Sequence, residues 1–331
     1  MRDDLYLSAT SGLYRARRDG GTWHMVGHGL RGRTVTCVVF CQGLILAGTT
    51  EGIWRSLDGG QRWSEANDGL EIRHVRSLTC FAKGEPLILA GTEPAGIFVS
   101  RERADTWFGC PEVADLRDKH GWYLPYSPEA GCVRGFALAG SSSPQARIFA
   151  AVEVGGALVS NDSGRKWHLV EGSDGNPTTN RPFEKIVHPD VHSITVHPSS
   201  PNLVIACTGG GLYRSIDDGK TWSCLYPCYC RAAWVNPADP EHIIFGPADG
   251  VSKNGRIEES RDEGKTWHLA STGMEPPWPR HMVERFVQVA DDLLVVLSNG
   301  ELWSRQLEVI DWRRLLPSID HVTDVASTTD A

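Results

Sequence analysis

Seven tryptophans, 40 to 60 positions apart, mark a repeat along the chain. Four of them end the same ungapped pattern, Ser-x-Asp-x-Gly-x-x-Trp, found in the segments Ser56–Trp63, Ser160–Trp167, Ser215–Trp222 and Ser260–Trp267. Three degenerate copies complete the series, at Ala16–Trp23, Ser100–Trp107 and Ser304–Trp312. A repeat of this period indicates one supersecondary unit per copy, each packed against its neighbours, and this excludes most other folds.

Short strand-like runs precede each tryptophan. Leu44–Thr49 leads across a turn into Gly52–Ser56, and the same order recurs at 87–100, 148–160, 203–215 and 293–304. These runs are rich in β-branched and aromatic residues and are bounded by Gly or Asp. Four short strands per repeat predict an all-β fold, a single seven-bladed β-propeller domain over residues 1–331. Its blades are expected to end near Trp23, Trp63, Trp107, Trp167, Trp222, Trp267 and Trp312.

The two ends of the sequence predict how the ring closes. The first copy begins at Leu5–Thr10 and has room for only three strands before Trp23. After the last tryptophan, His321–Ser327 has the pattern of an innermost strand with no further strand behind it. We therefore expect this C-terminal strand to complete blade one, which would remove the exposed edges of an open sheet.

The repeated turn has a local physical basis. Its Asp carboxylate can accept backbone N–H groups of its own turn, its Gly supplies a backbone conformation that other residues avoid, and its Trp anchors neighbouring strands. The four intact copies resemble the Asp-box (BNR) repeats of sialidase-like, sortilin-like and photosystem-assembly-factor propellers. That resemblance implies the fold and not the activity, since the fold serves unrelated functions. The sialidase pattern of six blades with an Arg-Ile-Pro segment is not found.

One column of charged residues stands out when the predicted innermost strands are aligned at their starts. It holds five arginines and two histidines, all predicted to bind a ligand at one mouth of the channel: Arg33, Arg76, Arg134, His192, Arg231, Arg285 and His321. Like charges around a narrow mouth repel, so something must offset them. Carboxylates at the same end could do so, namely Glu51, Glu93, Glu153 and Asp249 of the loops, with Asp190 and Glu284 nearby. A bound anion, gripped by guanidinium groups, is the alternative.

Two long connections are expected at the same face, at 108–131 and 171–190. Long loops on a rigid scaffold often carry recognition. Trp122 and Tyr126 of the first loop are therefore predicted ligand-binding aromatics above the cationic mouth. If the site is catalytic, His192 is the candidate acid or base, with Asp249 or Glu153 as its carboxylate partner.

Composition excludes several classes of function. The net charge is −8 and the pI about 5.8, which disfavours nucleic-acid and anionic-membrane partners. Nine cysteines without a signal peptide are expected to be reduced thiols of a cytoplasmic protein. The spacing of Cys224, Cys228 and Cys230 matches no standard zinc pattern, and arginines disfavour a cation at the mouth. We expect no metal and no cofactor.

These observations favour a cytoplasmic binding protein or assembly factor that holds an anionic small molecule or an acidic peptide end at an Arg/His-lined mouth. The alternative is a glycosidase-like hydrolase or lyase that acts on a carboxylated sugar or another small acid at the same place. A third possibility is a protein-interaction platform without a small ligand. The sequence does not decide whether the protein is an enzyme.

Overall fold

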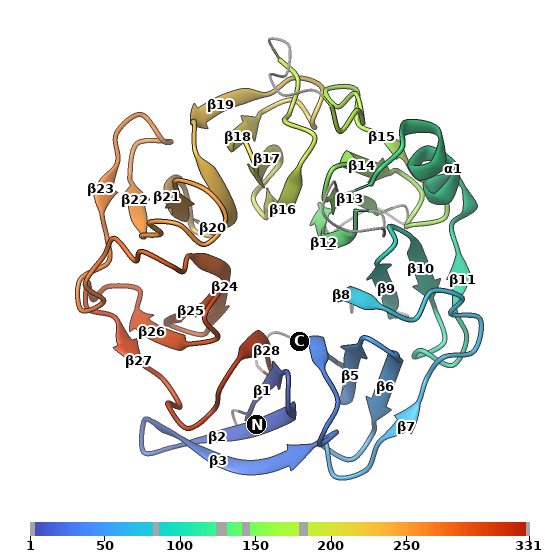
Figure 1. Cartoon of the computed structure of the whole chain (residues 1–331), viewed down its shortest axis with the longest axis vertical. Helices are drawn as coiled ribbons and strands as arrows, with labels where there is room; N and C mark the ends of the chain where they lie inside the picture. The colour runs from blue at the N-terminus through green and yellow to red at the C-terminus, as the bar shows by residue number, and fades with distance from the viewer. Residues whose placement is uncertain (1–3, 82–85, 124–130, 141–145, 179–184, 329–331) are drawn as a thin grey trace.

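Seven sheets of four strands each form a ring around a central channel (Figure 1). The computed structural model describes residues 4–81, 86–123, 131–140, 146–178 and 185–328. Each sheet is antiparallel and runs from an innermost strand at the channel to an outermost strand at the rim, which is short in every blade except the first. The predicted seven-bladed propeller is confirmed.

In the first three blades, the strands run from the channel outward in chain order, except that β28 takes the innermost place of blade 1. Blade 1 contains β28 (Val322–Ser327), β1 (Asp4–Ala9), β2 (Gly12–Asp19) and β3 (Thr22–Gly29). Blade 2 contains β4 (Val35–Cys41), β5 (Leu44–Thr49), β6 (Gly52–Ser56) and β7 (Ser64–Glu65). Blade 3 contains β8 (Val75–Phe81), β9 (Leu87–Thr92), β10 (Ile97–Ser100) and β11 (Phe108–Gly109).

The remaining four blades follow the same order. Blade 4 contains β12 (Val133–Ala139), β13 (Arg147–Val152), β14 (Gly156–Ser160) and β15 (His168–Leu169). Blade 5 contains β16 (Val191–His197), β17 (Ser200–Thr208), β18 (Gly211–Ser215) and β19 (Ser223–Tyr226). Blade 6 contains β20 (Tyr229–Asn236), β21 (Asp239–Ala248), β22 (Glu258–Ser260) and β23 (His268–Leu269). Blade 7 contains β24 (Val283–Val289), β25 (Asp292–Leu297), β26 (Leu302–Gln306) and β27 (Arg313–Arg314).

The repeated turn is built as its residues predict. In the copy at 160–167, Asp162 Oδ1 accepts the backbone N–H groups of Arg165 and Lys166, at 3.0 and 2.9 Å. Ser160 Oγ accepts the N–H of Gly164 at 2.8 Å, and that glycine has a φ of 80°. The indole N–H of Trp167 then donates to the Gly164 carbonyl at 3.2 Å. The turn therefore satisfies its own polar groups and leaves the tryptophan to pack between strands.

The core lies between adjacent blades. The second strands are buried along their length, as in Leu44–Thr49 and Leu87–Thr92, because each is covered on both faces. This explains their continuous apolar sequences, which would alternate if one face met water.

Blade 1 closes the ring as predicted, with β28 paired antiparallel to β1 (Figure 1). The expectation that the cysteines are all reduced is wrong for one pair. Cys41 and Cys80, at the ends of the innermost strands of blades 2 and 3, form a disulfide. Seven other cysteines are free. The ring brings together two thiols that are 39 residues apart in the sequence.

The connection 108–131 contains a helix that the sequence patterns did not indicate. Helix α1 (Pro111–His120) lies at the outer rim beside blade 4 and not over the channel (Figure 1). Its Val113 is buried, and Glu112 accepts the backbone N–H of Trp167 at 2.7 Å. Among the described residues, no helix has the length and apolar character needed to cross a membrane.

Candidate functional site at the channel mouth

Every blade carries an irregularity at the start of its innermost strand. In blade 3, for example, Val75 pairs with Thr92 and Ser77 with Gly91, so that Arg76 is an extra residue without a partner in the ladder. Such a β-bulge re-aims a side chain and locally ends regular pairing. The residues at this position, in blade order from 1 to 7, are Thr323, Thr36, Arg76, Arg134, His192, Arg231 and Glu284.

This register corrects part of the predicted column. Arg76, Arg134, His192 and Arg231 occupy the bulge as expected. Arg33, Arg285 and His321 do not, because the bulged residues of their blades are Thr36, Glu284 and Thr323.

The three displaced residues have other surroundings. Arg33 precedes β4, where Nη1 lies 2.5 Å from Glu51 Oε2 and the guanidinium carbon is 4.2 Å from the centre of the Trp54 ring. Arg285 follows the bulge and pairs with Val296 in the ladder. His321 precedes β28 with a φ of 55°.

The short or buried bulge residues link neighbouring blades. Thr323 Oγ1 donates to the Val35 carbonyl at 2.7 Å, and Thr36 Oγ1 donates to the Val75 carbonyl at 2.5 Å. His192 Nδ1 lies 2.7 Å from the carbonyl oxygen of Cys230, the residue that corresponds to those valines in blade 6. The bulge thus either ties blades together or sends a longer side chain into the channel.

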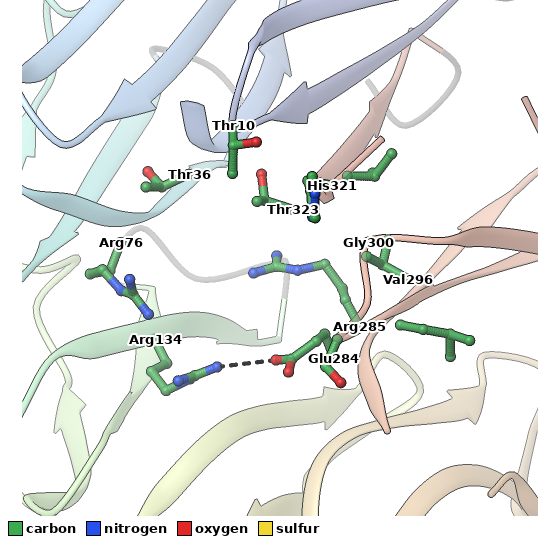
Figure 2. A pocket seen from close by; sticks show the side chains of 13 residues that line it. Thr10, Thr36, Arg76, Arg134, Glu284, Arg285, Val296, Gly300, His321 and Thr323 are labelled. Carbon is green, nitrogen blue, oxygen red and sulfur yellow. Dashed lines mark ion pairs between the residues drawn. The ribbon is translucent and has the colours of Figure 1, made fainter. Parts of the chain in front are cut away.

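A cavity of about 280 Å³ lies at this end of the channel (Figure 2). Arg76, Arg134 and Arg285 line it from three blades and point into it, and Glu284 lies between the last two. Thr10, Thr36 and Thr323 line the opposite side, and His321 lies at its edge. We call this space the mouth cavity.

Two of the three guanidinium groups of the mouth cavity, those of Arg76 and Arg134, are loosely paired, whereas Arg285 Nη1 lies 3.1 Å from Oδ1 of the buried Asp324. Arg76 Nε lies 3.4 Å from Glu93 Oε2, and Arg134 Nη1 lies 3.5 Å from Glu153 Oε2. A second contact of Arg134, from Nη2 to Glu284 Oε2, measures 3.7 Å. These separations exceed the usual 2.7–2.9 Å of charge-assisted hydrogen bonds. The arginines are therefore neutralised by nearby carboxylates, but their donor capacity is not used up.

The fourth arginine of the bulge is held more firmly. Arg231 Nη1 makes a close ion pair with Glu284 Oε1, and Arg231 Nε donates to the Tyr229 hydroxyl at 3.2 Å. Burial alone would lower the pKa of Arg231, but the charge of Glu284 together with Tyr229 raises it. The same holds for Arg134, whose pKa is raised chiefly by Glu153 against the effect of burial.

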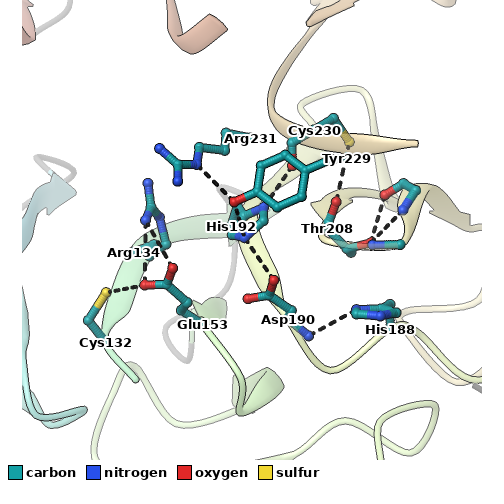
Figure 3. A network of polar contacts seen from close by, with 12 residues as sticks. Cys132, Arg134, Glu153, His188, Asp190, His192, Thr208, Tyr229, Cys230 and Arg231 are labelled. Carbon is teal, nitrogen blue, oxygen red and sulfur yellow. Dashed lines mark hydrogen bonds and ion pairs between the residues drawn. The ribbon is translucent and has the colours of Figure 1, made fainter. Parts of the chain in front are cut away.

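A buried polar network continues from Arg231 to His192 (Figure 3). The Tyr229 hydroxyl lies 3.4 Å from His192 Nε2, and Asp190 Oδ2 lies 3.1 Å from the same nitrogen. Burial would raise the pKa of Asp190, but the charge and hydrogen bond of His192 lower it to about 2. His192 Nδ1 faces a carbonyl and Nε2 faces a carboxylate, so both ring nitrogens lie beside oxygen atoms.

The three catalytic candidates are not gathered in the mouth cavity. The His192 side chain has 0% exposure, and Glu153 has 10%. Glu153 accepts a hydrogen bond from the Cys132 thiol at 3.0 Å. Burial would raise its pKa, but Arg134 in particular lowers it. Asp249 is half exposed and contacts Asn254 at 2.9 Å and Arg256 at 3.7 Å. The carboxylate beside His192 is that of Asp190 and not that of Asp249, which corrects the predicted pairing.

Glu153, Asp190 and His192 bring their ligand-type atoms within 4.8 Å of one another. Arg134 pairs with the first carboxylate, and His192 with the second. These contacts account for the cluster as a buried polar network.

Trp122, one of the two predicted aromatic residues, does not overhang the mouth cavity. Trp122 is 0% exposed, packs in the core between blades 3 and 4, and donates its indole N–H to the Gly175 carbonyl at 2.8 Å. This placement corrects the prediction that Trp122 binds the ligand. Burying its large apolar ring in the core stabilises the fold more than exposing it at the mouth would. Tyr126 lies outside the described residues.

Glu284, Asp190 and Tyr229 are the members of the site that strand-start alignment did not select. A sequence signal for the bulge does exist, since Val35, Val75, Val133, Val191, Val283 and Val322 each precede a bulged residue.

Comparison with known proteins supports the fold. No protein family and no curated protein matches the sequence. Among solved structures, an ancestral GH74 enzyme matches with a TM-score of 0.63 at 15% identity, over 98% of this chain but only 40% of that one. YCF48 from Cyanidioschyzon merolae matches with a TM-score of 0.62 at 14% identity, over 92% and 91% of the two chains. A structure of YCF48 bound to D1 peptide matches with a TM-score of 0.60 at 16% identity, over 91% and 89%. The chain is thus similar to seven-bladed propellers.

Proposed function

We propose that the protein is a binding protein or assembly factor whose mouth cavity holds a carboxylate, either of a small anion or of an acidic peptide end. The observation that carries the proposal is the convergence of Arg76, Arg134 and Arg285 on one cavity. Among the described residues that line it, Glu284 is the only acidic one.

The chemistry of the guanidinium group supports this ligand class. Arginine presents five N–H donors in a planar fork that matches a carboxylate. The long contacts of Arg76 and Arg134 to their own carboxylates leave donors available to a ligand. The hydroxyls of Thr36 and Thr323 on the opposite side already donate to backbone carbonyls, so the donors for a carboxylate come from the arginines. A neighbour of the same fold, YCF48, has been solved with a bound peptide, which fits an acidic peptide as partner.

The hydrolase or lyase alternative stays a prediction with less support. Its proposed acid or base, His192, is fully covered and already hydrogen-bonded through both nitrogens. A general acid or base must reach the reacting group directly or through one water molecule. A cytoplasmic location, Asp-box family membership and a platform role without a small ligand also stay predictions.

Ligand-induced stabilisation tests the proposal. We would measure thermal unfolding at constant ionic strength with phosphate, sulfate, citrate, uronic acids, sialic acid, aromatic acids, nucleotides and acidic peptides. A ligand at one hundred times its dissociation constant adds about 2.7 kcal/mol. With about 2 cal/mol/K of unfolding entropy per residue, this corresponds to a shift of about 4 °C.

Matched variants identify the site. Arg134→Gln should abolish the shift, because it removes a guanidinium from the mouth cavity. Arg55→Gln is the control, since Arg55 contacts Asp105 on the surface and does not line the cavity. A panel without any shift, or a shift that survives in Arg134→Gln, would reject the mouth cavity as an anion site.

A further inference from the structure

Glu284 occupies the bulge position that holds Arg, His or Thr in the other six blades. Four of the seven bulge residues are Arg or His and two are Thr, whereas Glu284 alone brings a negative charge. The bulge on β24 aims this carboxylate into the channel, and it reaches the mouth cavity between Arg134 and Arg285 (Figure 2). A carboxylate thus already lies among the guanidinium groups that would grip a ligand.

The contacts of Glu284 are unequal. Oε1 makes the close ion pair with Arg231, whereas Oε2 reaches Arg134 only at 3.7 Å. Arg231 belongs to blade 6, next to the blade of Glu284, but Arg134 belongs to blade 4, across the ring. Glu284 therefore has a firm attachment to its neighbour and a weak one across the channel.

We propose that Glu284 is an intramolecular occupant of the carboxylate site, and that a ligand carboxylate replaces it at Arg134. This inference rests on the proposed function and adds Glu284 as a residue that sets the affinity of the mouth cavity for carboxylates. The ligand carboxylate binds the donors of Arg134 that Glu284 only approaches, while Glu284 stays paired with Arg231.

The physical consequence is a built-in competition. Two carboxylates close to one guanidinium repel each other, and the low dielectric of a partly buried site strengthens that repulsion. The side chains concerned are largely covered, with 21% exposure for Glu284 and 16% for Arg134. The wild-type protein should thus bind carboxylates more weakly than the same site with a neutral residue at 284.

Glu284→Gln tests this because it keeps the shape of the side chain and removes its charge. The probe is tri-alanine with a fluorophore at its amino end and a free carboxyl end, and the amidated peptide serves as the uncharged comparison. Fluorescence anisotropy should show at least about fivefold tighter binding of the free-carboxyl peptide to Glu284→Gln, the lower range for coupled sites. Binding of the amidated peptide should not tighten.

Glu51→Gln is the matched control. It removes the same charge at the same end of the ring, but Glu51 pairs with Arg33 and does not line the mouth cavity. We expect less than about a twofold change in affinity, as screening by salt weakens exposed charges. Equal tightening in both variants would overturn the inference, since it would show an effect of net charge alone.

The remaining outcomes separate this inference from the proposed function. If the wild type binds the peptide and Glu284→Gln binds it equally or more weakly, the competition is refuted and the anion site stands. If neither protein binds it, the proposed function is rejected, and the inference with it. Should Glu284→Gln fail to fold, as judged by urea unfolding, Glu284→Asp replaces it. This shorter residue withdraws from Arg134, so binding should again tighten, and unchanged or weaker binding overturns the inference.

Discussion

Replacing Asp190 with asparagine should lower the free energy of unfolding by about 2 kcal/mol at pH 7. Asp190 Oδ2 lies 3.1 Å from Nε2 of the buried His192. Although burial opposes ionisation, His192 lowers the pKa of this carboxyl from 3.8 to about 2. One pKa unit corresponds to about 1.4 kcal/mol, and a lowered pKa means that the ionised form stabilises the folded state.

The sign of the pH dependence follows from the same shift. Stabilisation by Asp190 is fully present above the unfolded pKa of 3.8 and is lost as the pH falls toward about 2. The stability gap between wild type and Asp190→Asn should therefore be present at pH 7 and narrow in strong acid. Urea unfolding followed by tryptophan fluorescence at pH 7 and at about pH 2.5 measures it.

Asp118→Asn is the control for this experiment. Asp118 also pairs with a cation, Arg117, but at an exposed site, with 61% of the Asp118 side chain in solvent. Its replacement should leave the unfolding midpoint nearly unchanged, as exposed ion pairs contribute little. A gap for Asp190→Asn that is equally large at both pH values would refute the role assigned to its charge.

Three further outcomes follow from individual contacts in the ring. Ser160→Ala should cost about 1–3 kcal/mol in urea unfolding, because the buried N–H of Gly164 loses its acceptor; an unchanged midpoint would contradict this. Trp122→Phe should destabilise the chain by a similar amount, since the Gly175 carbonyl loses its donor, yet leave carboxylate affinity unchanged; a loss of peptide binding would instead place Trp122 in the ligand site. Burial, with help from a nearby carboxylate, raises the pKa of the Cys132 thiol to about 12. Iodoacetamide at pH 8 should therefore modify Cys132 much more slowly in the folded protein than in urea, as measured by mass spectrometry. Equal rates of modification in both conditions would contradict the raised pKa of this thiol.

The fold could be predicted from sequence because its signal is local and repeated. Each intact turn contains the residues that satisfy its own backbone, so the pattern recurs unchanged in blades 2, 4, 5 and 6 and in degenerate form in the other three. Features that depend on one blade only were missed. Helix α1 has a Pro at its start and basic residues in its last turn before Gly121, whose φ is 64°. Those are recognisable signals, but the helix is short and lacks an apolar stripe.

The site could be predicted only in part, because aligning the innermost strands on their charged residues did not give the correct strand register. Alignment on arginine selected Arg285, although Glu284 is the bulged residue. Alignment on the preceding valine, which packs between blades, would have identified Thr36, Glu284 and Thr323. Which carboxylate meets which arginine was harder still. The contact of Glu284 with Arg134 crosses the ring between blades distant in sequence, and no local pattern encodes it.

The pairing of β28 with β1 also governs the order in which this molecule can be made. A ribosome produces Asp4–Ala9 more than 300 residues before Val322–Ser327, yet these two strands are partners in one sheet. Until β28 has been synthesised, blade 1 lacks its innermost strand. The Val35 carbonyl then also lacks the hydrogen bond that the Thr323 hydroxyl donates in the folded ring. The growing chain is then an open arc with an unpaired strand at one end, the arrangement most prone to pairing with other chains. Pairing of β28 with β1 is the event that turns the arc into a ring.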